Sequence, residues 1–155
     1  MILLVHLLFG AAIGSTIKNI PLAIVLAFLS HYLLDFIPHI DYSIENIEKN
    51  RWKKSLPDFA KVFLDFLCGI ILIFVFSKSA LPAGRQAIVY ICAFCAILPD
   101  GFTILNSLMP NKILKIHSEF HPERVHVFKN KKISKFWRIL SQAMIVIISI
   151  LLLKN

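Results

Sequence analysis

The chain has 155 residues, of which 57% are hydrophobic, and its mean hydropathy is +0.74. A soluble domain contains only about 45–50% apolar residues. The excess lies in long runs, which argues against a soluble domain and predicts a single all-α integral membrane bundle, residues 1–155. The formal net charge of +8 does not indicate nucleic-acid binding, because the basic residues lie between the apolar runs and no known binding motif accompanies them.

Five apolar runs predict about five transmembrane helices, since each approaches the roughly 20 residues that span a bilayer. They cover about residues 2–17, 21–38, 58–77, 86–106 and 133–153. The first run lacks a basic leading region and a small-residue cleavage site, so we expect a retained helix and not a signal peptide. Cys68, Cys92 and Cys95 all lie inside apolar runs, where we interpret them as small hydrophobic residues and expect no disulfide.

Lysine and arginine are unevenly distributed between the two ends of the predicted bundle. If the helices alternate in direction, the N-terminus, residues 39–57 and residues 107–132 share one face. The opposite face carries only Lys18, Lys78, Arg85 and Lys154. The positive-inside rule therefore predicts that the first face is cytoplasmic, in an inner (cytoplasmic) membrane, and that the C-terminus lies outside.

Ionisable residues recur near the predicted cytoplasmic end of these runs, where their cost in a bilayer marks candidate functional sites. His6 lies in the first run, His31 and Asp35 in the second, Asp65 in the third and Asp100 at the end of the fourth. With a rise of about 1.5 Å per residue, each should lie within roughly 10 Å of the same face. Four helices therefore offer ligand-type side chains at comparable depth.

The end of the second run carries the densest group of candidate ligands. His31 and Asp35 are four residues apart and share one helix face, and His39 and Asp41 follow at once. Imidazole and carboxylate together suit zinc, iron or manganese. A bound cation would also offset the cost of placing carboxylates in a low-dielectric interior. Residues 31–41 therefore predict a metal site near the cytoplasmic face.

The basic 107–132 connection adds His117 and His121, again four residues apart, and then His126. The candidate ligands exceed the four of a closed structural zinc site, so we expect a cluster of two or three divalent transition-metal ions, with zinc as the first choice. Such clusters commonly clamp phosphate esters for hydrolysis. The full set of candidate metal ligands is His6, His31, Asp35, His39, Asp41, Asp65, Asp100, His117, His121 and His126.

Simpler interpretations exist for some of these residues. His6 could be a hydrogen-bonded core histidine, and Asp65 could pair with Lys61, four residues earlier. Asp58, which follows a proline, could be only a favourable charge at a helix start. His126 could be solvated, and the basic connection could anchor the chain to anionic lipid headgroups.

Two segments resemble motifs of the LexA-regulated, inner-membrane metal-dependent hydrolases. They are His6-Leu7-Leu8-Phe9-Gly10 and Ile37-Pro38-His39-Ile40-Asp41. Those proteins have an early His-x-x-x-Gly helix, a helix that ends in Leu-Pro-Asp-x-Asp, and further histidines. They are distantly similar to zinc-dependent phospholipase C and the P1-type nucleases, whose helical sites bind three zinc ions. The resemblance implies metal binding by His6, His39 and Asp41. This chain departs from the pattern in carrying His39 at the first Asp position and in lacking the later Arg-Gly-x-Thr-His-Ser segment.

We therefore expect a membrane-embedded, metal-dependent hydrolase that acts on a phosphoester of a lipid or lipid-linked substrate, with membrane lipids as its partners. Asp58 or Asp65 would accept the proton of a metal-bound water, and Arg124 would hold phosphate oxygens. The alternative is a divalent-metal or proton transporter that uses the same His/Asp cluster, although the outer half of every run is apolar. A third hypothesis is a non-catalytic assembly protein in which metal only joins the helices.

Overall fold

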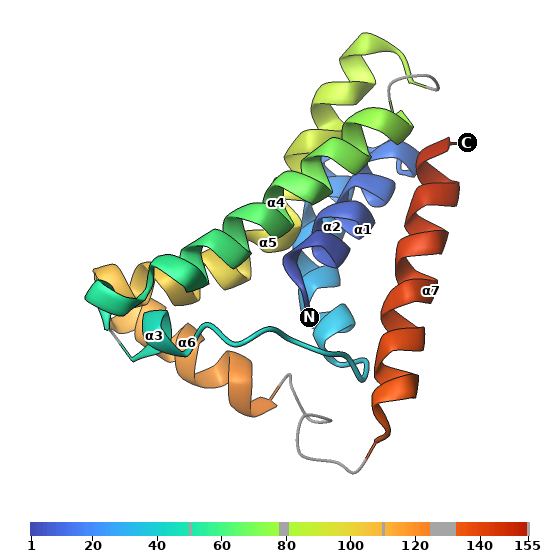
Figure 1. The fold of residues 1–155 in the computed structure, drawn as a ribbon. Helices are drawn as coiled ribbons and strands as arrows, with labels where there is room; N and C mark the ends of the chain where they lie inside the picture. Colours follow the sequence, from blue (N-terminus) through green and yellow to red (C-terminus); the bar gives the residue numbers. More distant parts are fainter. Residues whose placement is uncertain (50, 78–80, 110, 125–132, 155) are drawn as a thin grey trace.

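The computed structural model describes residues 1–49, 51–77, 81–109, 111–124 and 133–154, and these parts are helical with no strand among them. The elements in chain order are α1 (Leu3–Thr16), α2 (Ile20–Asp35), α3 (Glu45–Glu48), the 3-10 helix η1 (Trp52–Lys54), α4 (Leu56–Ser77), α5 (Ala83–Leu108), α6 (Lys112–Arg124) and α7 (Lys135–Lys154) (Figure 1). The expected all-α class is confirmed for the described residues. Helix α6 was not expected, because the basic 107–132 segment carries no long apolar run.

Three helices are long and apolar enough to cross a membrane, namely α4, α5 from Gly84 onwards, and α7. They indicate a membrane protein. Helices α1 and α2 have only 14 and 16 residues, or about 21 and 24 Å at a rise of 1.5 Å per residue, less than the roughly 30 Å hydrocarbon core. Of the five expected spans, three therefore meet the length criterion.

Local signals explain why the first two helices are short. The side chain of Asn19 accepts a hydrogen bond from the Leu22 N–H at 3.0 Å, and Pro21 occupies the first turn of α2. Both features start a helix and so end α1 shortly before. At the other end of α2, Pro38 disfavours helical geometry in the residue before it, and α2 ends at Asp35. The expected boundary at residue 38 is therefore three residues too long.

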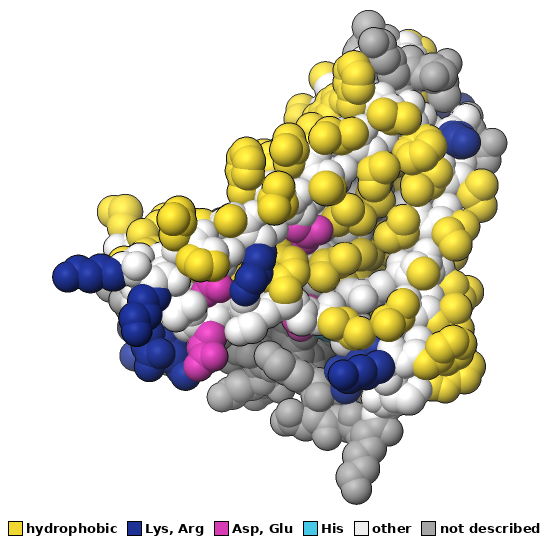
Figure 2. Space-filling view, in the orientation of Figure 1, with side chains coloured by type: hydrophobic (Ala, Val, Ile, Leu, Met, Phe, Trp, Pro, Cys, Tyr) yellow, Lys and Arg dark blue, Asp and Glu magenta, His cyan; other side chains and the backbone are white. Residues whose placement is uncertain are grey.

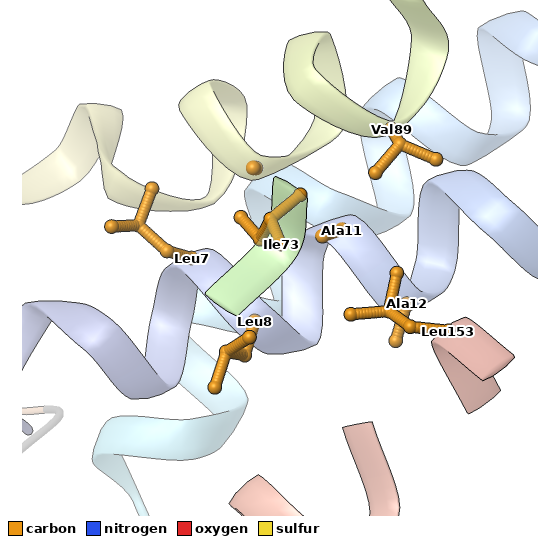
Figure 3. Packing of buried hydrophobic residues seen from close by; sticks show 8 residues of the cluster. Leu7, Leu8, Ala11, Ala12, Ile73, Val89 and Leu153 are labelled. Carbon is orange, nitrogen blue, oxygen red and sulfur yellow. The ribbon is translucent and has the colours of Figure 1, made fainter. Parts of the chain in front are cut away.

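Helix α1 is the centre of the bundle and contacts α2, α4, α5 and α7. It is apolar on almost every side, as expected for a helix surrounded by others. Figure 3 shows its core residues between the neighbouring helices. The buried cluster consists of Leu7, Leu8, Ala11 and Ala12 from α1, Ile73 from α4, Val89 and Ala93 from α5, and Leu153 from α7.

Small residues bring α1 and α2 very close to α5. A Cβ added at Gly10 would lie 2.5 Å from the Cβ of Ala96, and one added at Gly14 would lie 2.9 Å from the Ile88 carbonyl oxygen. Such glycine pairs let helix backbones approach closely within a membrane. On α2, the buried Ala23 and Ala27 pack in a cluster with Cys92 of α5. All three cysteines are free thiols, as expected.

The outer faces of α4 and α7 are apolar and exposed (Figure 2). Exposed apolar residues include Phe63, Leu64, Ile71 and Phe74 on α4, and Trp137, Ile139, Ile147 and Leu151 on α7. A lipid environment would cover these faces without cost, whereas water would not. Several Lys and Arg side chains instead gather around α3 and η1, at one end of α4, and others lie singly elsewhere on this face.

The helices alternate in direction, so that widely separated parts of the chain meet at each end of the bundle (Figure 1). At one end, the Arg85 guanidinium donates a hydrogen bond to the Ile17 carbonyl at the end of α1. At the other end, the Met1 amino group lies 2.7 Å from Asp35 Oδ1, where α2 ends. The candidate ligands on α1 and α2 therefore lie at the same end as the connection that leads to α3.

Candidate metal site

Close helix packing on α5 explains how the principal candidate ligands meet. His6 precedes Gly10 by one turn on α1, and His31 follows Ala27 by one turn on α2. Residues four apart lie on the same helix face. Both imidazoles therefore extend the faces that pack on α5, and they arrive beside Asp100 of that helix.

His6, His31 and Asp100 form a group of ligand-type side chains that could hold a metal ion. One ligand atom from each lies within 4.8 Å of the other two. The two imidazoles are fully buried and stacked, with ring centroids 4.2 Å apart. His31 Nε2 lies 3.6 Å from Asp100 Oδ1, close to the roughly 3.4 Å that separates two ligands of a tetrahedral zinc ion. The group could hold a metal ion with little rearrangement.

Asp35 contacts both imidazoles and is 1% exposed. Its Oδ1 is 3.2 Å from His6 Nε2, and its Oδ2 is 3.3 Å from His31 Nε2. The four-residue spacing of His31 and Asp35 predicted this meeting, whereas the contact with His6 joins two different helices. Asp35 therefore adds a carboxylate to the same group.

The hydrogen bonding of His31 leaves one ring nitrogen directed at the acidic residues. His31 Nδ1 lies 2.8 Å from the Ala96 carbonyl oxygen of α5. A carbonyl only accepts, so Nδ1 carries a proton, and Nε2 is the nitrogen that faces Asp35 and Asp100 and would bind an ion in its unprotonated form. Metal-binding histidines commonly have their second nitrogen fixed in this way. The Ala96 carbonyl thus positions His31 as a ligand.

Neither ring nitrogen of the fully buried His6 makes a hydrogen bond of good geometry among the described residues, although Nε2 lies 3.2 Å from Asp35 Oδ1. Buried polar side-chain atoms are nearly always hydrogen-bonded, because leaving them bare costs free energy. The simpler interpretation of His6 as a hydrogen-bonded core histidine is therefore not observed. A cation beside Asp35 would supply the missing interaction for Nε2.

His39 and Asp41 form a neighbouring pair, linked to the first group through Asp35. His39 Nε2 lies 3.2 Å from Asp41 Oδ2, and the Met1 amino group lies 2.9 Å from Asp41 Oδ1 as well as against Asp35. Burial alone would raise the pKa of Asp41, but the His39 ring and the Met1 ammonium outweigh it and hold this pKa below its usual value. A positive group thus already lies between the two carboxylates.

Asp65 lies beside this pair and not within the His6 group. Its Oδ2 accepts hydrogen bonds from the Tyr42 hydroxyl at 3.2 Å and from the Leu4 N–H at 3.3 Å. The alternative pairing with Lys61 is wrong, because the Lys61 ammonium contacts Asp58 at 3.2 Å instead. Burial and the Asp65 carboxylate together raise the pKa of Tyr42 above its usual value, so the hydroxyl remains a donor.

Asp58 has contacts that hold the chain together near the start of α4. Besides Lys61, it accepts a hydrogen bond from the Asn46 N–H of α3 at 2.9 Å. None of these partners is a candidate metal ligand. The contacts agree with the simpler interpretation of Asp58 as a charge at a helix start.

His117 of α6 contacts Tyr32, which lies beside the site. Its Nε2 lies 3.0 Å from the Tyr32 hydroxyl, and its ring packs edge-on against Phe102. The Tyr32 ring in turn lies against the His31 ring. Of the other candidates in this segment, His126 and the side chains of His121 and Arg124 lie outside the described residues.

Two residues of α7 contribute to the site without having been predicted. Arg138 Nη1 donates to the His39 carbonyl at 3.2 Å, and Gln142 Nε2 donates to the Ile40 carbonyl at 2.8 Å. They fix the backbone of the segment that carries the second pair of candidate ligands. Their four-residue spacing predicts that both side chains share one face at the start of the last helix. The sequence does not indicate that this face meets His39 and Ile40, which lie far away along the chain.

No protein-family model, characterised protein or solved structure matches this chain. The family resemblance of the two sequence motifs therefore stays a prediction.

Proposed function

We propose that the chain is a membrane-embedded, metal-dependent hydrolase whose ion is bound by His6, His31 and Asp100. The observation that carries the proposal is the close meeting of these three side chains, with the acidic Asp35 against both buried imidazoles. A catalytic zinc ion keeps a position for water or substrate and can expand to five ligands, so a further oxygen from Asp35 would still leave that position. The imidazole and carboxylate donors suit zinc or a related divalent ion.

A second ion would share Asp35 with the first. Asp35 contacts both imidazoles through its two oxygens, while Asp41 and His39 lie on its other side, joined to it through the Met1 amino group. A divalent ion in the place of the Met1 ammonium would neutralise the negative charges of Asp35 and Asp41. Two ions bridged by one carboxylate would clamp the attacking and leaving oxygens of a phosphoester.

Access to the site from one side favours hydrolysis over transport. The Asp41 and Asp100 side chains are each 34% exposed, so the site is open at its own end of the bundle. Toward the opposite end, α1 closes on α5 at Gly10 and Gly14, where even a methyl group would clash. A transport path would need polar groups across the whole membrane, and the buried residues described there are mainly apolar, with Ser77 and Ser149 as polar exceptions.

The chemistry follows from the site's position and donors. A bound ion would lower the pKa of a water and polarise the phosphoryl oxygen. As the water oxygen bonds to phosphorus, the phosphorus–oxygen bond to the alcohol would break, and a carboxylate would take the water's proton and pass it to the leaving alcohol oxygen. Of the two expected bases, Asp65 is favoured over Asp58, because its partner Tyr42 directly follows Asp41. A substrate phosphate on a lipid or lipid-linked molecule suits a site at the end of membrane helices.

The first experiment is elemental analysis of the purified chain. The wild-type protein should carry at least one transition-metal ion per chain, and His6→Ala, His31→Ala and Asp100→Asn should each lose most of it. His117→Ala is the matched control, because it removes an imidazole that contacts Tyr32 and does not belong to the His6, His31 and Asp100 group. Full occupancy in the His31→Ala protein would contradict the assignment of the ligands.

The second experiment measures turnover in detergent. The metal-loaded protein should cleave a phosphomonoester, a phosphodiester or a phospholipid, and Asp100→Asn should reduce the rate by about 10²-fold or more. Metal uptake into sealed vesicles, without cleavage of any phosphoester, would instead establish transport. The hydrolase would then be abandoned and only the metal site retained.

A further inference from the structure

A cationic cavity lies on the single turn of η1, immediately before the membrane-length helix α4. The turn is closed by the Lys54 N–H, which donates to the Arg51 carbonyl at 2.8 Å. The cavity has a volume of about 460 Å³ and is lined by Arg51, Trp52, Lys53 and Lys54. We call it the η1 cavity. It shares no residue with the candidate metal site.

The cations of the η1 cavity have no acidic partner among the described side chains. Glu45 and Asp58, the nearest acids whose side chains the structure describes, pair with other lysines, Glu45 with Lys49 and Asp58 with Lys61 at 3.2 Å. No ion pair joins any described carboxylate to a cation of the cavity. A concave surface with three positive charges outside these ion pairs favours an anionic ligand, because the charges gain a partner without breaking an existing pair.

An apolar stripe leads away from the cavity along α4. Trp52 stacks on Phe59 with ring centroids 6.2 Å apart, and the stripe continues on the same helix face through Leu56 and Phe63, which are 78% and 62% exposed. Tryptophan is enriched at the membrane–water interface. Because α4 is long and apolar enough to cross a membrane, the η1 cavity lies where lipid headgroups are found.

We propose that the η1 cavity binds the phosphate of an anionic phospholipid, whose acyl chains lie along the α4 stripe. Arginine and lysine donate charge-assisted hydrogen bonds to phosphate oxygens, and basic groups beside membrane spans attract anionic lipids. The volume of the η1 cavity lies within the range of roughly 300–1,000 Å³ that is typical of small-ligand sites. A soluble phosphate would use the cations but not the stripe, so the stripe selects the lipid as the ligand.

The test uses the fluorescence of Trp52 in the full-length chain. Trp137→Phe leaves Trp52 as the single tryptophan, and the protein is reconstituted in phosphatidylcholine vesicles that contain a minor fraction of brominated lipid. Brominated phosphatidylglycerol should quench Trp52 more strongly than the same fraction of brominated phosphatidylcholine. In Lys53→Gln/Lys54→Gln, the preference should fall by about fivefold for each lysine removed, the equivalent of about 1 kcal/mol per charge.

The matched control is Lys112→Gln/Lys115→Gln, which removes two positive charges from α6 and should keep the preference. Three results would overturn the proposal. The two brominated lipids could quench equally, or the α6 variant could lose as much preference as the η1 variant, which would indicate only a general surface potential. Reversal of the quenching by millimolar inorganic phosphate would assign the cavity to a soluble anion. Circular dichroism of each variant confirms that the helices are retained.

Discussion

Gly10→Ala tests whether the spacing of α1 and α5 sets the metal site. The new methyl carbon would lie 2.5 Å from the Ala96 Cβ and 2.7 Å from the Cys92 carbonyl oxygen. The carbonyl belongs to the backbone and cannot rotate away, so the two helices must separate by roughly 1 Å. Overpacking of this kind costs about 1–3 kcal/mol, and the better helix propensity of alanine returns up to about 1 kcal/mol. We expect a net loss of about 1 kcal/mol in the free energy of unfolding.

The effect on metal binding should be larger than the effect on stability. His6 is one turn from Gly10, so the separation moves it relative to Asp100 by a similar distance. Metal–ligand bond lengths vary by only about 0.2 Å, and loss of a residue that positions a ligand costs about 10- to 100-fold in affinity. The Gly10→Ala protein should therefore bind metal at least about tenfold more weakly.

Two measurements on purified protein in detergent decide the question. Unfolding by increasing mole fractions of dodecyl sulfate, followed by helical circular dichroism, gives the stability, and competition with a chromophoric chelator gives the metal affinity. Gly84→Ala is the control, because nothing lies within 4 Å of its added Cβ, and both quantities should stay within error. Wild-type metal affinity in Gly10→Ala would refute the argument that close packing of α1 on α5 holds the ligands together.

Reporter fusions test the charge-based topology: those at Lys18 and Lys154 should both report outside and one at Lys49 inside, because the helices alternate and the basic connections share one face. A cytoplasmic reporter at Lys154 would contradict this alternation. Arg85→Gln should lower the free energy of unfolding by about 1 kcal/mol, because the guanidinium donates to the Ile17 and Lys18 carbonyls at the end of α1. Metal affinity should be retained, and unchanged stability would show that this contact does not hold the helix end.

The sequence determined the class of the protein and the end of the bundle at which the ligands lie. Long apolar runs identify membrane helices without knowledge of their partners, since the bilayer acts on each segment separately. Local signals such as Asn19 and Pro21 fix the turn between α1 and α2. The meeting of His31 and Asp35 also follows from the chain alone, because helical geometry places residues four apart side by side.

Only the tertiary structure decided which ligand-type residues share one site. The four-residue rule applied equally to Lys61 and Asp65, yet Asp65 accepts hydrogen bonds from Tyr42 and Leu4 of other segments. His6 meets Asp100 because Gly10 and Gly14 lack side chains and let α1 approach α5. Such contacts depend on the shapes of two helix surfaces that are distant in sequence, and hydropathy and spacing contain no information about their fit.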